Sequence, residues 1–366
     1  MQTLYPNLIL DALKNVRYPG NGENIVKLGM VEDDIRIDGN KVSFSLIFDR
    51  PTDPFMKSLV KAAESAIHVN ISPEVEVTVN TKSRHMVPEA AEKPLKGVKN
   101  IIGVASGKGG VGKSTVASNL AVALAAEGYK VGLLDADIFG PSMPKMFGIE
   151  DEQLFIHKVD GRDLIIPAHR YGVKLLSIGF LVDRDSAVLW RGSMASNALK
   201  QLINDADWGD LDYFLIDMPP GTSDIHLTLV QTLAITGVVI VTTPQQVALA
   251  DARKGISMFT GDKVNVPILG LVENMAWFSP EKHPDEKYYI FGREGGVKLA
   301  EELNVPLLAQ LPIAEQVCDD GDRGEPAALA DNAVGMAYRH LAREVVDATD
   351  RRNQQQPPTK RVELKH

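Results

Sequence analysis

The chain has 366 residues, a formal net charge of −9 and a sequence pI near 5.5. Its length exceeds what one ordinary hydrophobic core needs and predicts about two domains. The acidic balance argues against a protein that holds nucleic acid through a broad basic face. A single cysteine excludes an intramolecular disulfide framework. No secretory signal or membrane-length apolar run is visible, so we expect a cytoplasmic protein without membrane or nucleic-acid partners.

The first 80 residues predict a small α+β domain, residues 1–80. In chain order the expected elements are a helix at 4–16, strands at 25–31 and 41–48, a helix at 54–68 and a strand at 74–79. A turn at Asp38-Gly39-Asn40 is expected between the first two strands. Residues 81–97 are mostly polar and contain Pro88 and Pro94, which predicts a linker.

Residues 98–348 repeat the order strand, loop, helix. Apolar strands are expected at 101–105, 131–134, 175–178, 214–216, 238–242, 268–272 and 307–311, and helices at 113–127, 193–205, 224–234, 248–259, 295–303 and 333–348. Strands without a polar face, alternating with helices, indicate an α/β fold with a mainly parallel sheet covered on both faces. Residues 349–366 are rich in glutamine, proline and charge, which predicts a disordered tail.

A phosphate-binding loop is predicted directly after the strand at 101–105. The residues Gly107-Lys108-Gly109-Gly110-Val111-Gly112-Lys113-Ser114 satisfy the pattern G-x-x-x-x-G-K-[ST]. The glycines let backbone N–H groups surround phosphate oxygens, Lys113 supplies positive charge, and the Ser114 hydroxyl can ligate Mg²⁺. A glycine-rich turn with an incidental lysine is the alternative, but the strand before and the helix after favour a P-loop.

Carboxylates follow two of the predicted strands. Asp217 ends the apolar run before Met218-Pro219-Pro220-Gly221, as an aspartate does that orders Mg²⁺. The Gly221 amide is expected to be free to sense a γ-phosphate. Asp135 and Asp137 follow the strand at 131–134, where a carboxylate can hold the attacking water. One such aspartate alone would indicate a helix cap; the pair after a P-loop favours function.

Three segments carry a family resemblance: GKGGVGKST, DADIFGPSMPKMFG and FLIDMPPGTSD, together with WRG at 190–192. Over about residues 98–345 they resemble the Mrp/ApbC family of iron–sulfur cluster carrier ATPases, a P-loop NTPase family. That family lies within the larger group that contains MinD, ParA and the nitrogenase iron protein. The N-terminal unit resembles the small domain that also occurs alone in iron–sulfur assembly factors.

The resemblance implies ATP and Mg²⁺ as cofactors, a homodimer, and apoprotein acceptors of iron–sulfur clusters. Lys108 would reach the phosphates of the partner subunit's nucleotide, and Thr115 would touch the α-phosphate. Asp137 would position water, Asp217 would act on Mg²⁺, and Asn274 would contact adenine. Without the family, Asn274 is interpreted as a loop cap at a strand end.

The sequence departs from that family where the cluster ligands are expected. Family members usually have a Cys-x-x-Cys pair in the stretch that corresponds to residues 275–284, which contains no cysteine here. Cys318 is the only thiol, so two copies in a dimer would offer half of the four ligands that a [4Fe–4S] cluster takes. A free cysteine is most often a small buried apolar residue, and Glu281, His283 and Asp285 indicate a solvated loop.

Three functions remain open on the sequence. The first, which is the function we expect, is an ATPase that binds iron–sulfur clusters and transfers them to apoproteins. The second is a nucleotide-switched assembly scaffold that holds no cluster itself, which the missing cysteines favour. The third is a positioning ATPase of the MinD/ParA kind, for which the C-terminal segment offers neither an amphipathic membrane helix nor a basic DNA face.

Overall fold

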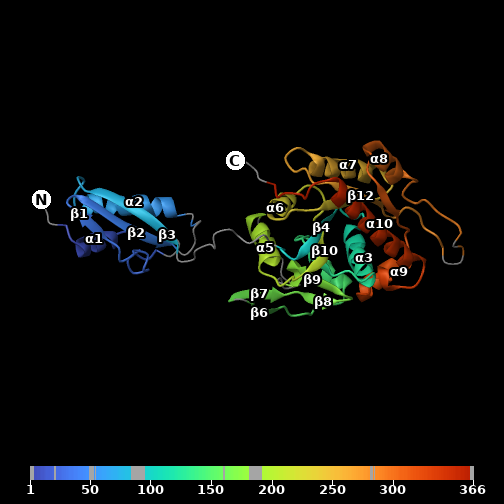
Figure 1. Ribbon diagram of the computed structural model, residues 1–366, viewed down its shortest axis with the longest axis horizontal. Helices are drawn as coiled ribbons and strands as arrows, with labels where there is room; N and C mark the ends of the chain where they lie inside the picture. Colours follow the sequence, from blue (N-terminus) through green and yellow to red (C-terminus); the bar gives the residue numbers. More distant parts are fainter. Residues whose placement is uncertain are drawn as a thin grey trace. The chain divides into compact units, whose positions relative to one another are not determined.

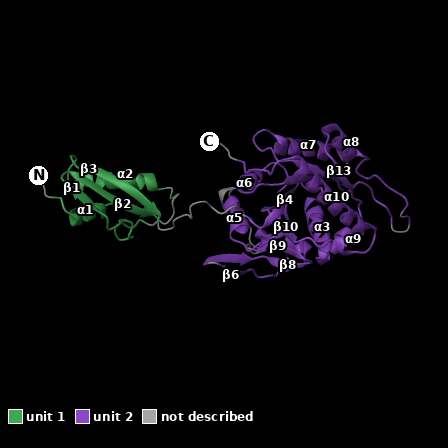
Figure 2. Cartoon of the chain, in the orientation of Figure 1, with its two compact units in different colours: residues 1–92 green, residues 93–366 purple. Residues whose placement is uncertain are grey.

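The computed structural model (Figure 1) describes residues 4–19, 22–48, 53, 55–83, 95–159, 161–180, 192–280, 283 and 285–362. The chain forms two compact units, residues 1–92 and residues 93–366, drawn in green and purple in Figure 2. The division lies within the segment 81–97. Across the described ranges, none of the helices combines the length and the apolar character that a bilayer crossing requires.

The described residues of unit 1 form a three-stranded sheet with two helices. Its elements are α1 (Pro6–Leu13), β1 (Arg36–Asp38), β2 (Lys41–Phe48), α2 (Met56–Asn70) and β3 (Glu76–Ser83). The strand order is β1-β2-β3, with β1 antiparallel and β3 parallel to β2. Alternate residues of β2, such as Phe44 and Phe48, are buried in one core with Leu59 and Ile67 of α2. This arrangement is the expected small α+β unit.

The strand expected at 25–31 is wrong. Hydrogen bonds from the Leu28 amide to the Asn24 carbonyl and from Gly29 to Val26 make this segment a series of turns. Gly29 has φ of +63°, a left-handed conformation that ends any extended run. The strand before the turn at Gly39 is instead the short β1, which pairs with the start of β2.

Unit 2 is built on one eight-stranded sheet. Its strands are β4 (Val98–Ala105), β5 (Val131–Asp135), β8 (Ala168–Arg170), β9 (Val173–Ser177), β10 (Leu211–Asp217), β11 (Gly237–Thr242), β12 (Ile268–Glu273) and β13 (Leu307–Gln310). They lie in the order β13-β12-β11-β4-β10-β5-β9-β8, and every neighbouring pair is parallel except the edge pair β8–β9. The P-loop strand β4 is therefore central.

Helices cover both faces of this sheet (Figure 1). They are α3 (Lys113–Ala126), α4 (Met143–Met146), α5 (Gly192–Asn204), α6 (Asp224–Thr232), α7 (Gln246–Thr260), α8 (Gly295–Leu303), α9 (Glu315–Arg323) and α10 (Ala333–Gln355), with 3₁₀ turns at Ile178–Phe180 and Ala327–Leu329. Successive residues of β4 enter different cores: Ile102 packs with Leu120 of α3, whereas Ile101 packs with residues of α5, α6 and α7. The predicted parallel sheet with two covered faces is confirmed.

A hairpin of β6 (Phe155–Val159) and β7 (Arg162–Ile166) has no counterpart among the expected elements. It forms a separate two-stranded sheet, and Phe155 and Ile156 are exposed. The sequence-based prediction assumed that strands and helices alternate, whereas antiparallel strands are inserted between β5 and β9. The edge strand β8 was missed for the same reason.

The disordered segment expected from residue 349 is wrong for the first part of that range. Helix α10 continues to Gln355, and Thr349 is fully buried with its hydroxyl donating to the Val345 carbonyl at 2.7 Å. Beyond the helix, Arg352 donates to the Pro357 carbonyl at 2.8 Å, and the Val362 amide donates to the Val230 carbonyl of α6 at 3.0 Å. Composition suggested disorder, but these anchors hold the segment; residues 363–366 lie outside the described ranges.

Candidate nucleotide-binding site

The P-loop joins the end of β4 to the first turn of α3. Gly110 and Gly112 have φ of +81°, which residues with a side chain rarely adopt. A Cβ atom on Gly107 would lie 2.1 Å from the backbone of Asp251, and one on Gly112 would lie 2.2 Å from Asn274 Nδ2. The loop therefore needs glycine for its conformation and for its packing. The free N–H groups at the start of α3 favour an anion at this point.

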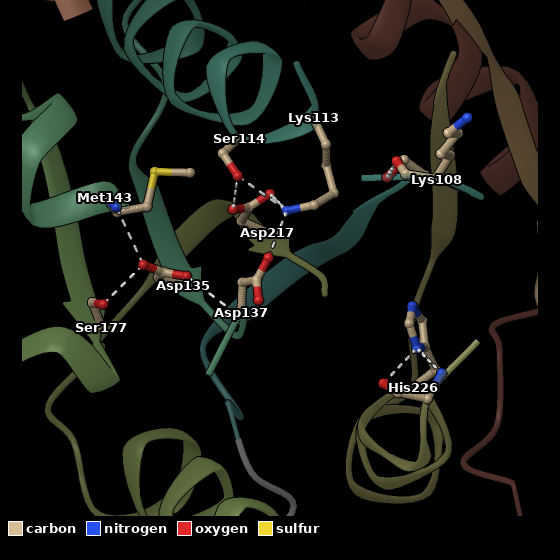
Figure 3. Close-up of polar contacts among 11 residues, drawn as sticks. Lys108, Lys113, Ser114, Asp135, Asp137, Met143, Ser177, Asp217 and His226 are labelled. Atoms are coloured by element: carbon tan, nitrogen blue, oxygen red, sulfur yellow. Dashed lines mark hydrogen bonds and ion pairs between the residues drawn. The ribbon is translucent and has the colours of Figure 1, made fainter. Parts of the chain in front are cut away.

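Four predicted site residues meet at the end of this loop (Figure 3). Lys113 is only 6% exposed, and its Nζ lies 2.6 Å from Asp217 Oδ1 and 3.8 Å from Asp137 Oδ2. The Ser114 hydroxyl donates to Asp217 Oδ2 at 2.7 Å. Asp217 is fully buried at the end of β10, beside β4 in the sheet. Strand pairing thus brings together Lys113 and Asp217, which are 104 residues apart in sequence.

The charges of this cluster are mutually dependent. Burial raises the pKa of Asp217, and the positive charge of Lys113 opposes that rise. Burial likewise raises the pKa of Asp137, again against Lys113. One lysine therefore stabilises two carboxylates in their ionised form. The Ser114 and Asp217 oxygens are hard ligands of the kind Mg²⁺ prefers and lie side by side, so these residues fit a magnesium ion.

Asp135 has a different role from its neighbour Asp137. It is fully buried and accepts hydrogen bonds from the Ser177 hydroxyl at 2.8 Å and from the Met143 and Asp137 amides at 3.2 Å each (Figure 3). Burial raises its pKa to about 7, with a smaller contribution from the negative charge of Asp217. Its contacts fix the turn after β5. Asp135 therefore positions Asp137, while Asp137 faces the lysine.

The structure also shows the arrangement of Gly221 and Lys108. The Gly221 amide is not free, because it donates to the Ser106 carbonyl at 2.9 Å. The neighbouring P-loop residue Lys108 is exposed, and its side chain points away from the Lys113–Asp217 cluster (Figure 3). Lys108 thus makes no contribution to the charge cluster of its own chain. A phosphate that uses the Gly221 amide must displace the Ser106 carbonyl.

The end of β12 forms another wall of the loop. Asn274 is 6% exposed, and its Nδ2 donates to the Val111 carbonyl at 2.9 Å. Glu273 is fully buried and accepts from the Gly296 amide at 2.6 Å and from Gln310 Nε2 at 2.5 Å. An anion at the first turn of α8 is favourable. Sequence reasoning missed Glu273, although a carboxylate that ends an apolar strand was a usable signal.

Cys318 is exposed on α9, so the interpretation of a small buried apolar residue is wrong. Its Sγ lies 4.0 Å from Asp322 Oδ2. The residue lines a pocket of about 220 Å³ between α3, α4 and α9, whose wall also contains Thr115, Ser142 and Lys145. The only thiol of the chain therefore lies near the first turn of α3 and outside the stretch 275–284.

The other candidate iron ligands among the described residues do not form a cluster. In the parts of the chain that the structure describes, no group of three or more His, Cys, Asp or Glu side chains could hold a metal ion. His283 is exposed and lies 3.7 Å from Glu286, in keeping with a solvated loop. Glu281, Trp190 and Arg191 lie outside the described residues, and Gly192 is the first residue of α5.

A central parallel sheet, a glycine loop leading into α3, and aspartates at the ends of adjacent strands define a P-loop NTPase. Residues 97–346 match the family model for the ParA class described as NUBPL iron-transfer P-loop NTPase, and residues 7–79 match that of an iron-sulfur cluster assembly protein. The chain belongs to the NUBPL iron-transfer P-loop NTPase family. The resemblance seen in the sequence is thereby confirmed.

Similar proteins span nearly the whole chain. An iron-sulfur cluster carrier protein of Synechocystis sp. is 41% identical over 347 residues, which cover 93% of this chain and 97% of the relative. An iron-sulfur cluster carrier protein of Aquifex aeolicus is 39% identical, with 92% and 96% covered. The solved structure of a nucleotide-binding protein from Archaeoglobus fulgidus in complex with ADP is 37% identical with a TM-score of 0.55, covering 63% of this chain and 88% of that one.

Proposed function

We propose that this protein binds ATP with Mg²⁺, hydrolyses the ATP, and binds iron–sulfur clusters for transfer to apoproteins. The observation that carries the ATPase half is the cluster of Lys113, Ser114, Asp137 and Asp217 at the end of the P-loop. The names of the relatives support the carrier half. A cytoplasmic homodimer belongs to the same proposal, and the single cysteine agrees with a reducing compartment.

The geometry suggests how the residues act in order. The phosphates of ATP bind the loop N–H groups and attract Lys113 away from Asp217, because the phosphate oxygens offer it a competing negative charge. Asp217 and Ser114 are then free to hold Mg²⁺, which would neutralise charge on the phosphates. Asp137, held by its backbone on Asp135, orients the attacking water. Thr115 is proposed to contact the α-phosphate and Asn274 to contact adenine.

Lys108 is proposed to act on the nucleotide of the partner subunit. Its exposed side chain points away from the cluster of its own chain, so it is available across a dimer interface (Figure 3). Lys108→Ala should therefore retain nucleotide binding and lose hydrolysis, because it removes a cation that stabilises the transition state but does not hold the ground state. ADP affinity by calorimetry and phosphate release under saturating ATP measure the two effects.

A mixture of two inactive variants tests whether this lysine works across the interface. In a dimer of Lys108→Ala and Asp137→Ala chains, one composite site keeps both groups. An equal mixture should regain about one quarter of the wild-type activity, because half of the dimers are mixed and one of their two sites is complete. No recovery on mixing, or equal loss of binding in Lys108→Ala and Lys113→Ala, would contradict a role in trans.

The cargo half of the proposal depends on Cys318. Thiolates are the ordinary ligands of iron–sulfur clusters, and this is the only thiol in the chain. Two copies in a dimer supply two thiolates, and the remaining ligands must come from an acceptor protein or a small thiol. Cys318→Ser removes the soft ligand with little change in size, so we expect the reconstituted chromophore and cluster transfer to disappear. Iron and sulfide per dimer after anaerobic reconstitution are the measurement.

Two controls accompany that experiment. Wild-type protein whose thiol has been alkylated should behave like Cys318→Ser, and ATP hydrolysis measured in parallel separates lost ligation from lost folding. If Cys318→Ser binds as much iron and sulfide as the wild type, the thiol is not a ligand. A nucleotide-switched scaffold is the second candidate function, favoured by the lack of any three-residue metal site among the described residues. Wild-type protein that hydrolyses ATP but binds no cluster would establish the scaffold.

A further inference from the structure

The loop between β10 and α6 carries Gly221, whose amide can bind a phosphate only after it leaves the Ser106 carbonyl. Residues 218–223 follow Asp217 and run beside the P-loop strand: the Met218 amide donates to the Val104 carbonyl at 3.0 Å, and Gly221 donates to Ser106. Gly221 has φ of +78°, so its amide direction depends on a conformation that glycine permits. The residue that anchors the α6 end of this loop therefore limits the positions that the Gly221 amide can take.

That anchor is His226, in the first turn of α6. Its Nδ1 accepts a hydrogen bond from the Ser223 amide at 3.1 Å, and the Ser223 hydroxyl lies 3.2 Å from the same nitrogen. Ser223 and His226 thereby form a capping box at the start of α6. An amide can only donate, so Nδ1 carries no proton and the neutral ring carries its proton on Nε2. Figure 3 shows this contact on the Lys108 side of the site.

The opposite ring nitrogen is not used by the capping box. His226 is 1% exposed, and its Nε2 makes no hydrogen bond of normal geometry to the described residues, although the Pro219 carbonyl is close enough to act weakly on the ring. The ring meets Phe259 of α7 edge-on at 5.9 Å between centroids. Burial is the main cause that lowers its pKa, while the backbone of Ser223 and, more weakly, of Pro219 acts the other way. A buried donor without a partner in a native structure calls for a reason.

A glutamate or glutamine at this position would complete the cap equally well. The cap alone therefore does not explain a buried imidazole with a spare donor beside the loop. We propose that His226 is a positioning residue for ATP hydrolysis: it ties the loop 219–223 to α6 at Ser223 and, through Nε2, pairs with the loop when Gly221 exchanges the Ser106 carbonyl for the γ-phosphate. This inference rests on the proposed ATPase function.

The test compares three variants by nucleotide discrimination as well as by rate. His226→Leu fills similar space without either polar contact, so kcat should fall by about tenfold or more, because a loosely held group costs orientation. Its preference for a non-hydrolysable ATP analogue over ADP should also be lost, while ADP affinity changes by less than about threefold. His226→Gln restores an acceptor for the Ser223 amide and a donor, and should recover most of both quantities.

Asn332→Ala is the matched control. Asn332 caps α10 by accepting from the Val334 and Gly335 amides, away from the loop. Its loss should lower the melting temperature and leave the ratio of analogue to ADP affinity as in the wild type. A purely structural role for His226 would give that same result for His226→Leu.

Two outcomes overturn the proposal. One is a His226→Leu variant that prefers the ATP analogue over ADP as strongly as the wild type does. The other is a His226→Gln variant whose preference is no stronger than that of His226→Leu. Should the leucine variant not fold, His226→Asn replaces it: its Oδ1 takes the position of Nδ1 and can accept from the Ser223 amide, but it has no donor at the position of Nε2, so discrimination must be lower than in His226→Gln. If the wild type hydrolyses no ATP, the proposed ATPase fails, whereas the affinity ratios still decide the role of His226.

Discussion

Replacing Lys113 by alanine is expected to abolish ATP hydrolysis and to weaken ADP binding by about 100-fold or more, since charged contacts to phosphate are the strong ones. Lys113 is the buried cation of the site, within 2.6 Å of Asp217 and 3.8 Å of Asp137. Its removal takes away the cation that attracts the phosphates and that lowers the pKa of both Asp137 and Asp217. Calorimetric titration with ADP and a phosphate-release assay measure both losses.

The matched control is Lys99→Ala, at the start of β4, the strand that leads into the P-loop. Lys99 is exposed and pairs with Asp212 at 2.8 Å. An exposed pair of this kind contributes little to stability, and the change should leave ADP affinity within about twofold of the wild type, because it lies outside the site. Normal turnover in Lys113→Ala would refute the P-loop assignment.

Asp217→Asn is expected to lower hydrolysis by about 10²–10³-fold, because the variant lacks the carboxylate that holds Mg²⁺ beside Ser114. For ADP affinity without Mg²⁺, the structure predicts no such loss in the same variant. Lys113 Nζ donates to Asp217 Oδ1 at 2.6 Å, so a phosphate must compete with that carboxylate for the lysine. When a chelator removes Mg²⁺, Asp217→Asn should therefore bind ADP at least as tightly as the wild type does. Added Mg²⁺ should strengthen ADP binding by the variant only slightly.

ADP titrations with and without Mg²⁺ measure this separation of metal and phosphate binding. Asp212→Asn, at the start of the same strand β10, is the control and should keep the magnesium dependence of the wild type. Weaker ADP binding in the chelator for Asp217→Asn would show that Asp217 does not compete for Lys113. A melting curve of the ATPase unit must accompany the titration, since removing one partner of a buried pair destabilises a protein.

The sequence predicted which side chains cluster at the end of the P-loop, but it did not predict the hydrogen bonds around that cluster. A P-loop requires a strand before it and a helix after it, and both signals are local, so β4 and α3 could be placed within a few residues. Asp137 and Asp217 could be assigned because parallel strands end on one edge of the sheet. The bond between Gly221 and Ser106 joins residues whose approach depends on tertiary packing, and no local pattern reports it.

The misplaced elements share a physical cause. Residues 25–31 have the apolar content of a strand, but Gly29 allows a turn and tertiary packing uses Ile25 and Met30 from that turn. Thr349 and Arg352 lie in a polar stretch that composition alone marks as disordered, yet each finds a hydrogen-bond partner. His226 was missed because a capping box is recognised by Glu or Gln three residues after the cap, and histidine takes that place here.

The strand order has a consequence for how the chain is made. The central strand β4 pairs with β10, and Lys99 and Asp212 of these strands are 113 residues apart in sequence. At about 5–20 residues per second of synthesis, β4 waits on the order of ten seconds before its neighbour leaves the ribosome. During that interval the apolar residues Ile101, Ile102 and Val104 have no strand beside them. Unit 1 needs no such delay, because β2 and β3 are joined through the single helix α2. The nascent unit 2 is therefore expected to depend on chaperones far more than unit 1, and to aggregate first when synthesis outpaces them.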